Sequence, residues 1–70
     1  MRREWLAAIR RKQGLTQSAV AGRVGISTPS YCTIETGKTN PRVATAMKIA
    51  GVLGFKWTRF FEDEKEDRSA

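Results

Sequence analysis

The sequence lacks histidine altogether and has a single cysteine, Cys32, among its 70 residues. One cysteine cannot close a disulfide within the chain, and without histidine the usual zinc-ligand sets cannot be built. The sequence also has no glycine-rich phosphate loop, and its carboxylates lie mostly near the C-terminus, so no acid–base or nucleophile pair can be proposed. We therefore expect no metal, no cofactor, no small-molecule ligand and no enzymatic activity.

Long apolar runs are also missing. No stretch approaches the roughly 20 apolar residues of a membrane span, and the basic N-terminus MRREW is not followed by the apolar core of a signal peptide. We expect a chain that is neither inserted into a membrane nor exported. A cytoplasmic location suits its one unpaired thiol.

Acidic residues are scarce in most of the chain. Residues 1–61 hold 11 Lys and Arg against 2 Asp and Glu, a net charge of +9, whereas residues 62–70 hold 2 against 5. The cationic part predicts a polyanionic partner, and the lack of a long basic amphipathic helix favours nucleic acid over membrane. We expect one small domain over 1–61 and, because it has no apolar residue except its last, a disordered acidic tail over 62–70.

Two short helices joined by a tight turn are expected between Thr16 and Glu35. Thr16 is a suitable N-cap for the first helix, and Gly25 can adopt the left-handed conformation that ends it. Ser27 provides a second N-cap, and Pro29 falls in the first turn of the next helix, where its missing N–H is harmless. The pattern predicts a helix-turn-helix.

Other helices are expected on both sides of this unit. A first helix over about residues 2–13 has an apolar stripe, and its basic side chains are expected mostly to face solvent. A fourth helix should open at Pro41 and end at Gly54, and an aromatic segment over 55–61 closes the domain. The apolar stripe of the first helix comprises Trp5, Leu6 and Ile9; its solvated cations are Arg2, Arg3, Arg11 and Lys12; the buried side of the fourth helix comprises Val43, Ala46, Met47, Ala50 and Leu53.

The segments LTQSAVAGRVGIS and IETGKTNP, followed by an Ala-rich helix and LGFKWTRFFE, resemble the XRE family of lambdoid phage repressor and Cro proteins. The resemblance covers about Leu6 to Glu62, and the closing segment is most similar to regulators from phages and mobile elements of Gram-positive bacteria. It implies an all-α, compact five-helix repressor-like domain with a central helix-turn-helix. It also implies a DNA-binding transcriptional regulator, a repressor, that binds a pseudo-palindromic double-stranded operator as a homodimer.

Specific residues follow from this resemblance together with helical geometry, which places Tyr31 and Ile34 inward. The expected base-reading residues are Thr28, Pro29 and Thr33, with Cys32 and Ser30 as further candidates. The expected phosphate contacts are Gln17, Ser18, Lys38, Thr39, Asn40 and Arg42. Arg10 and Glu35 are expected to form a structural ion pair, and Trp57, Arg59 and Phe60 a dimer interface. Gly22 departs from the family pattern, where a long polar residue is usual.

Plainer interpretations remain open at this point. Each of the expected contact residues can instead be an ordinary solvated side chain, and all of the C-terminal rings can be buried in the core. In function, the alternative is an antitoxin-like or other protein-interaction module that uses the same fold and its aromatic C-terminus to hold a partner. Steep salt dependence of duplex binding would distinguish a DNA-binding regulator from such a module.

Overall fold

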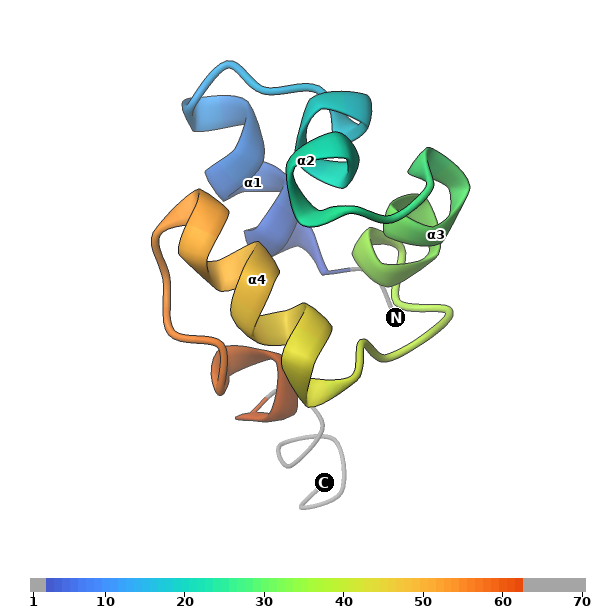
Figure 1. Ribbon diagram of the computed structural model, residues 1–70. Coiled ribbons are helices and arrows are strands. Elements are labelled where there is room, and N and C mark those ends of the chain that lie inside the picture. The colour runs from blue at the N-terminus through green and yellow to red at the C-terminus, as the bar shows by residue number, and fades with distance from the viewer. Residues whose placement is uncertain (1–2, 63–70) are drawn as a thin grey trace.

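The computed structural model describes residues 3–62. Its helices are α1 (Glu4–Lys12), α2 (Gln17–Val24), α3 (Thr28–Glu35) and α4 (Val43–Leu53), followed by a fifth, one-turn helix over residues 59–62. Within this described range there is no β-strand, so the predicted all-α, five-helix fold is confirmed (Figure 1). Glu62, the first residue of the expected tail, belongs to the last helical turn, and the remainder of that tail lies outside the described residues.

The turn between α2 and α3 forms as its sequence predicts. The Thr16 hydroxyl accepts a hydrogen bond from the Ala19 amide at 3.0 Å, and the Ser27 hydroxyl accepts one from the Ser30 amide at 3.2 Å. Between them, Gly25 has a φ of 89°, in the left-handed region where a Cβ would be strained. Because these signals act over three or four residues, local sequence is enough to set this turn.

Helix α4 is rotated relative to the expectation. Its buried residues are Ala46, Ile49, Ala50 and Leu53, whereas Val43 is 50% exposed and Met47 is 51% exposed. At 100° per residue, Val43 and Met47 lie about 70° and 110° from the centre of the buried face. The prediction that these two side chains are buried was therefore wrong, and packing against the other helices selects Ile49 instead.

The start of α4 also differs from the prediction. Arg42 is the N-cap, with an extended backbone at φ −67° and ψ 159°, so the helix begins at Val43 rather than at Pro41. Helix α1 likewise begins later than expected, at Glu4, with Arg3 as its N-cap. These changes leave the order of the helices as predicted.

An aromatic cluster closes the core on the C-terminal side. The rings of Trp5, Phe55 and Phe60 meet edge to face, with centroids 5.1 to 5.6 Å apart, a favourable geometry for ring quadrupoles. Phe60 is 1% exposed and belongs to the main core with Leu6 and Tyr31. The prediction that Phe60 lies in a dimer interface is therefore wrong, because its ring is already covered by other residues of the same chain.

Candidate nucleic-acid interface

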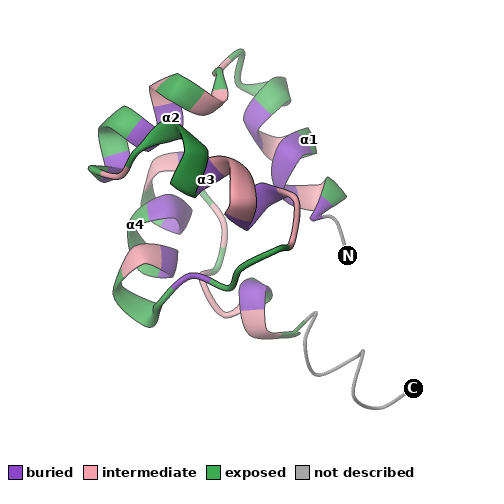
Figure 2. Ribbon diagram, turned by 90° about the vertical axis from the view of Figure 1, so that its right-hand side faces the viewer, coloured by how far each residue is buried: buried purple, intermediate pink, exposed green. Residues whose placement is uncertain are grey.

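The outer face of α3 is made of small side chains. Thr28, Pro29 and Ser30 are exposed and Cys32 and Thr33 are partly exposed, while Tyr31, Ile34 and Glu35 face the interior. Figure 2 shows the exposed first turn of α3 on the same side of the molecule as the exposed stretch of the loop that follows it. The expected base-reading residues thus share one accessible surface.

The Thr33 hydroxyl is held in a defined orientation. It donates a hydrogen bond to the Ser30 carbonyl at 2.8 Å, and its oxygen lies 3.1 Å from the Thr39 hydroxyl oxygen. Since a hydroxyl has one hydrogen, the Thr39 hydroxyl is the donor in the second contact. Thr33 therefore presents a methyl group and one remaining acceptor lone pair to the surroundings. No pattern in the sequence predicts this pairing between helix and loop.

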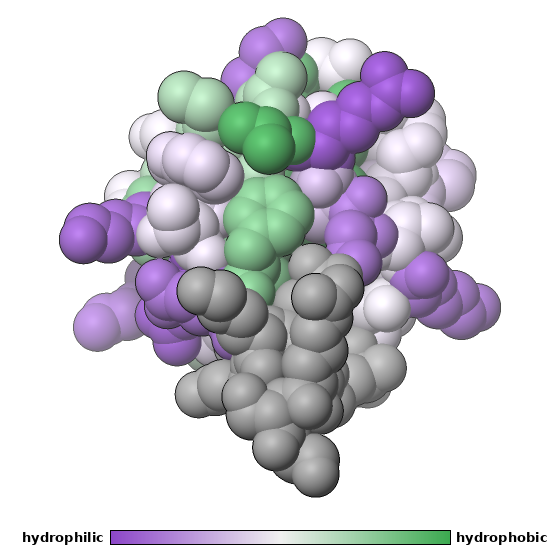
Figure 3. Space-filling model, turned by 90° about the horizontal axis from the view of Figure 1, so that it is seen from below, coloured by the Kyte–Doolittle hydropathy of each residue, from purple (hydrophilic) through white to green (hydrophobic). Residues whose placement is uncertain are grey.

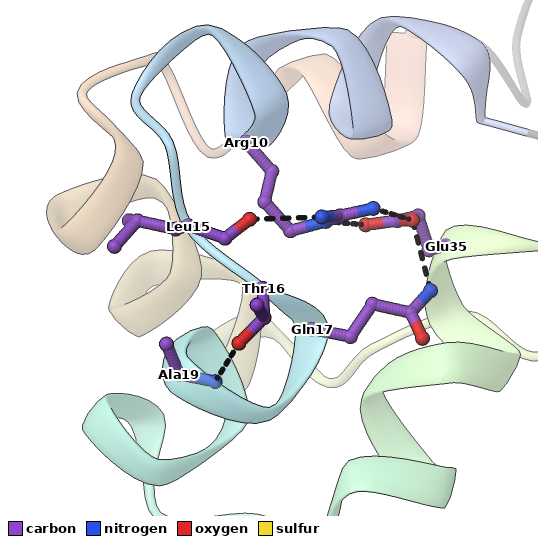
Figure 4. Close-up of polar contacts among 6 residues, drawn as sticks. All are labelled: Arg10, Leu15, Thr16, Gln17, Ala19 and Glu35. Carbon is purple, nitrogen blue, oxygen red and sulfur yellow. Dashed lines mark hydrogen bonds and ion pairs between the residues drawn. The ribbon is translucent and has the colours of Figure 1, made fainter.

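The N-terminus of α2 lies beside a buried ion pair (Figure 4). The Arg10 guanidinium donates to both carboxylate oxygens of Glu35, at 2.8 and 3.0 Å, and to the Leu15 carbonyl at 2.9 Å. Gln17 Nε2 also donates to Glu35, at 3.0 Å. The expected Arg10–Glu35 pair is present, and it joins α1, α3 and the first residue of α2.

This pairing controls the protonation of Glu35. Burial by itself raises the pKa of a carboxyl group, but the hydrogen bonds from Arg10 and Gln17 outweigh it, and the pKa of Glu35 is lowered. Tyr31 is fully buried beside it, and burial followed by the nearby carboxylate raises the pKa of its hydroxyl. The group therefore stays as a carboxylate, a guanidinium and a neutral phenol at neutral pH.

The loop between α3 and α4 carries the exposed polar residues expected to contact phosphate. Lys38, Thr39, Asn40 and Arg42 are all exposed. The amides of Lys38 and Thr39 both donate to the Thr33 carbonyl, at 3.0 and 3.3 Å. These bonds fold the start of the loop back onto the end of α3, so the loop and the outer face of α3 form one continuous surface.

Arg3 is the residue that sequence reasoning misplaced most clearly. It was expected on a solvated helix face, but it is 7% exposed. Its guanidinium donates to the Ile34 carbonyl at 2.6 Å, to the Thr39 carbonyl at 3.1 Å and to Asn40 Oδ1. These partners are 31 to 37 positions away in the chain, so no local pattern could have revealed them.

A separate apolar hollow of about 460 Å³ lies between the start of α4 and the C-terminal turn. It is lined by Val43, Trp57, Thr58, Phe61 and Glu62. Figure 3 looks onto this end of the molecule and shows an apolar strip bordered by hydrophilic side chains. Of the residues expected at a dimer interface, Trp57 lines the hollow, whereas the exposed Arg59 places its guanidinium 4.5 Å from the centre of the Trp5 ring.

Residues 3–62 contain neither a metal-ligating cluster nor a membrane-spanning helix. No three His, Cys, Asp or Glu side chains gather there in a group that could hold a metal ion. No helix in the same residues is long and apolar enough to cross a membrane.

Comparison with known proteins identifies the family. The sequence profile of the helix-turn-helix family matches residues 6–60. YqaF of Bacillus subtilis (strain 168), an uncharacterized HTH-type transcriptional regulator, is 44% identical over 63 residues, which cover 90% of this chain and 83% of YqaF. The HTH-type transcriptional regulator PuuR of Escherichia coli (strain K12) is 38% identical over 63 residues, covering 89% of this chain but 34% of PuuR.

A shorter match reaches y4dJ of Sinorhizobium fredii, another uncharacterized HTH-type transcriptional regulator, which is 42% identical over 48 residues, 69% of this chain and 62% of y4dJ. No solved structure shows a significant match. The family match includes α3 and the loop after it, which form the exposed surface described above. The chain therefore belongs to the XRE family of helix-turn-helix proteins.

Proposed function

We propose that this protein is a sequence-specific transcriptional repressor that binds a pseudo-palindromic operator in double-stranded DNA as a homodimer. The observation that carries the proposal is the outer face of α3, which is accessible, free of large apolar side chains and continuous with an exposed basic loop. The names of YqaF and PuuR as HTH-type transcriptional regulators support it. Such a regulator would act in the cytoplasm.

In this proposal α3 enters the major groove. Thr28, Pro29, Thr33 and Cys32 face the bases, and none of them has the two-pronged donor set of Arg, Asn or Gln. Thr33 offers a methyl group for contact with a thymine methyl and an acceptor for an exocyclic amino group. Readout would therefore depend on methyl contacts, single hydrogen bonds and DNA shape.

Phosphate contacts would come from the start of α2 and from the loop after α3. The first-turn amides of a helix have no intrahelical acceptor, so Gln17 and Ser18 provide N–H groups for an anion. Gln17 Nε2 uses one hydrogen on Glu35 and has a second. Lys38, Asn40 and Arg42 add donors from the loop, two of them charged. Thr39 would contact a phosphate by exchanging its hydroxyl hydrogen bond to Thr33 for one to a phosphate oxygen.

The apolar hollow supports the homodimer. One recognition helix reads only a few base pairs, so a family member of this size gains specificity by pairing two copies across half-sites about 34 Å apart. Trp57 and Phe61 line the hollow, and Val43 and Met47 are half-exposed apolar side chains on the neighbouring α4. Apolar surface of this kind, bordered by polar side chains, is typical of protein contacts. A homodimer of this kind would repress transcription simply by occupying the operator.

Selection of binding sites from random duplexes tests the proposal. We expect an operator with two-fold symmetry, and we expect Thr33→Ala to relax preference at one base pair per half-site by about 1–3 kcal/mol. Thr45→Ala removes the same atoms from α4, outside the helix-turn-helix, and should keep the parent preference. If Thr33→Ala and Thr28→Ala both return the parent operator at undiminished preference, α3 does not read the bases.

The same hollow also fits the alternative function, a protein-interaction module. A DNA-binding dimer that neutralises about 6 phosphates should show log K falling against log salt with a slope of roughly −5. An interaction module would show little duplex affinity and a flat salt response.

The homodimer is tested by sedimentation of the free protein together with footprinting of the bound operator. A protein that sediments as a monomer at working concentration and protects a single unpaired half-site would contradict the homodimer.

A further inference from the structure

The Arg3 side chain connects the beginning of α1 to the end of the recognition helix. Its backbone amide donates to the Glu35 carbonyl at 2.9 Å, and its guanidinium donates to the Ile34 carbonyl at 2.6 Å. Carbonyls in the last turn of a helix have no intrahelical donor, so they need partners of this kind. Arg3 therefore anchors the C-terminal end of α3 from outside the helix-turn-helix unit.

The same guanidinium also holds the loop. It donates to the Thr39 carbonyl at 3.1 Å and to Asn40 Oδ1. Because a guanidinium has only donors, it can pair with the carbonyl oxygen of Asn40 and not with its amide nitrogen. The planar fork thus fixes the α3 terminus, the Thr39 backbone and the Asn40 side chain relative to one another.

Thr39 in turn contacts a base-facing residue. Its hydroxyl is 3.1 Å from the hydroxyl of Thr33, whose own hydrogen is donated to Ser30. A chain of direct contacts therefore leads from Arg3 through Thr39 to Thr33. Arg3 is also held in place by packing, because its guanidinium carbon lies 5.3 Å from the centre of the buried Phe60 ring.

We propose that Arg3 is a positioning residue for sequence readout, which sets the base preference of Thr33 by fixing the end of α3 and the Thr33–Thr39 pair. This inference rests on the proposed function as a sequence-specific DNA-binding protein. Its physical basis is the short reach of the recognition side chains. A threonine cannot extend to recover a hydrogen bond, whose donor–acceptor distances span only about 0.5 Å, so a small shift of α3 abolishes the contact.

The experiment compares Arg3→Met with Lys12→Met. Both variants remove one positive charge from the ends of α1, but Lys12 is exposed at the last residue of that helix. The readout is the ratio of affinities for the selected parent operator and for operators changed at single base pairs. At the base pair that Thr33→Ala identifies, we expect Arg3→Met to reduce the ratio about 5- to 10-fold, at the lower end of the range for loss of one specific contact, and Lys12→Met to leave it unchanged.

Two further variants keep the test decisive if Arg3→Met does not fold. Arg3→Lys keeps the positive charge but loses the planar set of guanidinium donors. We therefore expect its ratio of operator affinities to lie between that of the parent protein and that of Arg3→Met. Thr39→Val removes only the exposed hydroxyl that contacts Thr33, and it should change preference at the same base pair while the fold persists. If both proteins fold, combining Arg3→Met with Thr39→Val should reduce preference by less than the product of the single effects, because the two residues act along one chain of contacts.

A measurement without DNA separates this inference from the proposed function. The Lys38 amide donates to the Thr33 carbonyl, and its hydrogen exchange should accelerate in Arg3→Met but not in Lys12→Met. Faster exchange with an unchanged affinity ratio at every base pair would overturn the positioning role and leave the proposed function intact. A parent protein that prefers no duplex over another would overturn both.

Discussion

Breaking the Arg10–Glu35 pair should remove a large part of the stability of the domain. The carboxylate takes two hydrogen bonds from the buried Arg10 guanidinium and a third from Gln17. Removing one partner of a buried pair leaves the other charge without compensation and costs about 3–5 kcal/mol. At about 0.05–0.15 kcal/mol per residue, a domain of this size has only about 4–10 kcal/mol of stability in total. Glu35→Leu alone should therefore consume a large part of it.

Urea unfolding followed by circular dichroism measures this effect. With a slope of about 1 kcal/mol per molar urea, a loss of 3 kcal/mol lowers the midpoint by about 3 M. The matched variant is Arg10→Met with Glu35→Leu, which replaces both charges by apolar side chains. Because such replacement is often neutral or stabilising, the double variant should be more stable than Glu35→Leu. A loss below about 1 kcal/mol in Glu35→Leu, the size typical of an exposed ion pair, would refute this reasoning.

The pH dependence provides a second measurement of the same pair. The folded-state pKa of Glu35 lies below its ordinary value of 4.5. The stability that its ionised form contributes is therefore complete above pH 4.5 and is lost as the pH falls through the folded pKa. In that window the parent should lose up to about 1.4 kcal/mol per pH unit from this group. Glu35→Gln should lack this component, and equal acid slopes in the two proteins would contradict the lowered pKa.

Four further outcomes are expected. Gly22→Ala should raise stability by about 1 kcal/mol, since an added Cβ meets nothing within 4 Å among the described residues and alanine is the better helix former; a lower melting temperature would contradict this. Gly25→Ala should lower stability by about 1–2 kcal/mol because the turn needs a positive φ, and unchanged urea unfolding would count against it. Lys38→Ala should weaken all duplexes alike and reduce the magnitude of the salt slope by about 2 for a dimer, which competition binding at several salt concentrations would detect or refute. Phe61→Asp, in the apolar hollow, should shift sedimentation from dimer to monomer while circular dichroism stays helical, and a dimer that persists would place the interface elsewhere.

The sequence by itself determined the local architecture. Thr16, Gly25 and Ser27 act on backbone groups within three or four residues, so they predicted the caps and the turn of the helix-turn-helix correctly. Helical spacing also separated the inward Tyr31 and Ile34 from the outer face of α3. The Arg10–Glu35 pair was available only from the family resemblance, because its members lie 25 positions apart.

Tertiary structure decided what the long side chains do. Periodicity gives the angles between residues on one helix but not the rotation of that helix against its neighbours, so the exposure of Met47 and the burial of Phe60 could not be read from spacing. The burial of the charged Arg3 side chain could not be read from spacing either. Its partners, the end of α3 and the loop after it, are brought to the start of α1 only by folding, and a guanidinium that sequence assigns to solvent becomes buried because those carbonyls need a donor.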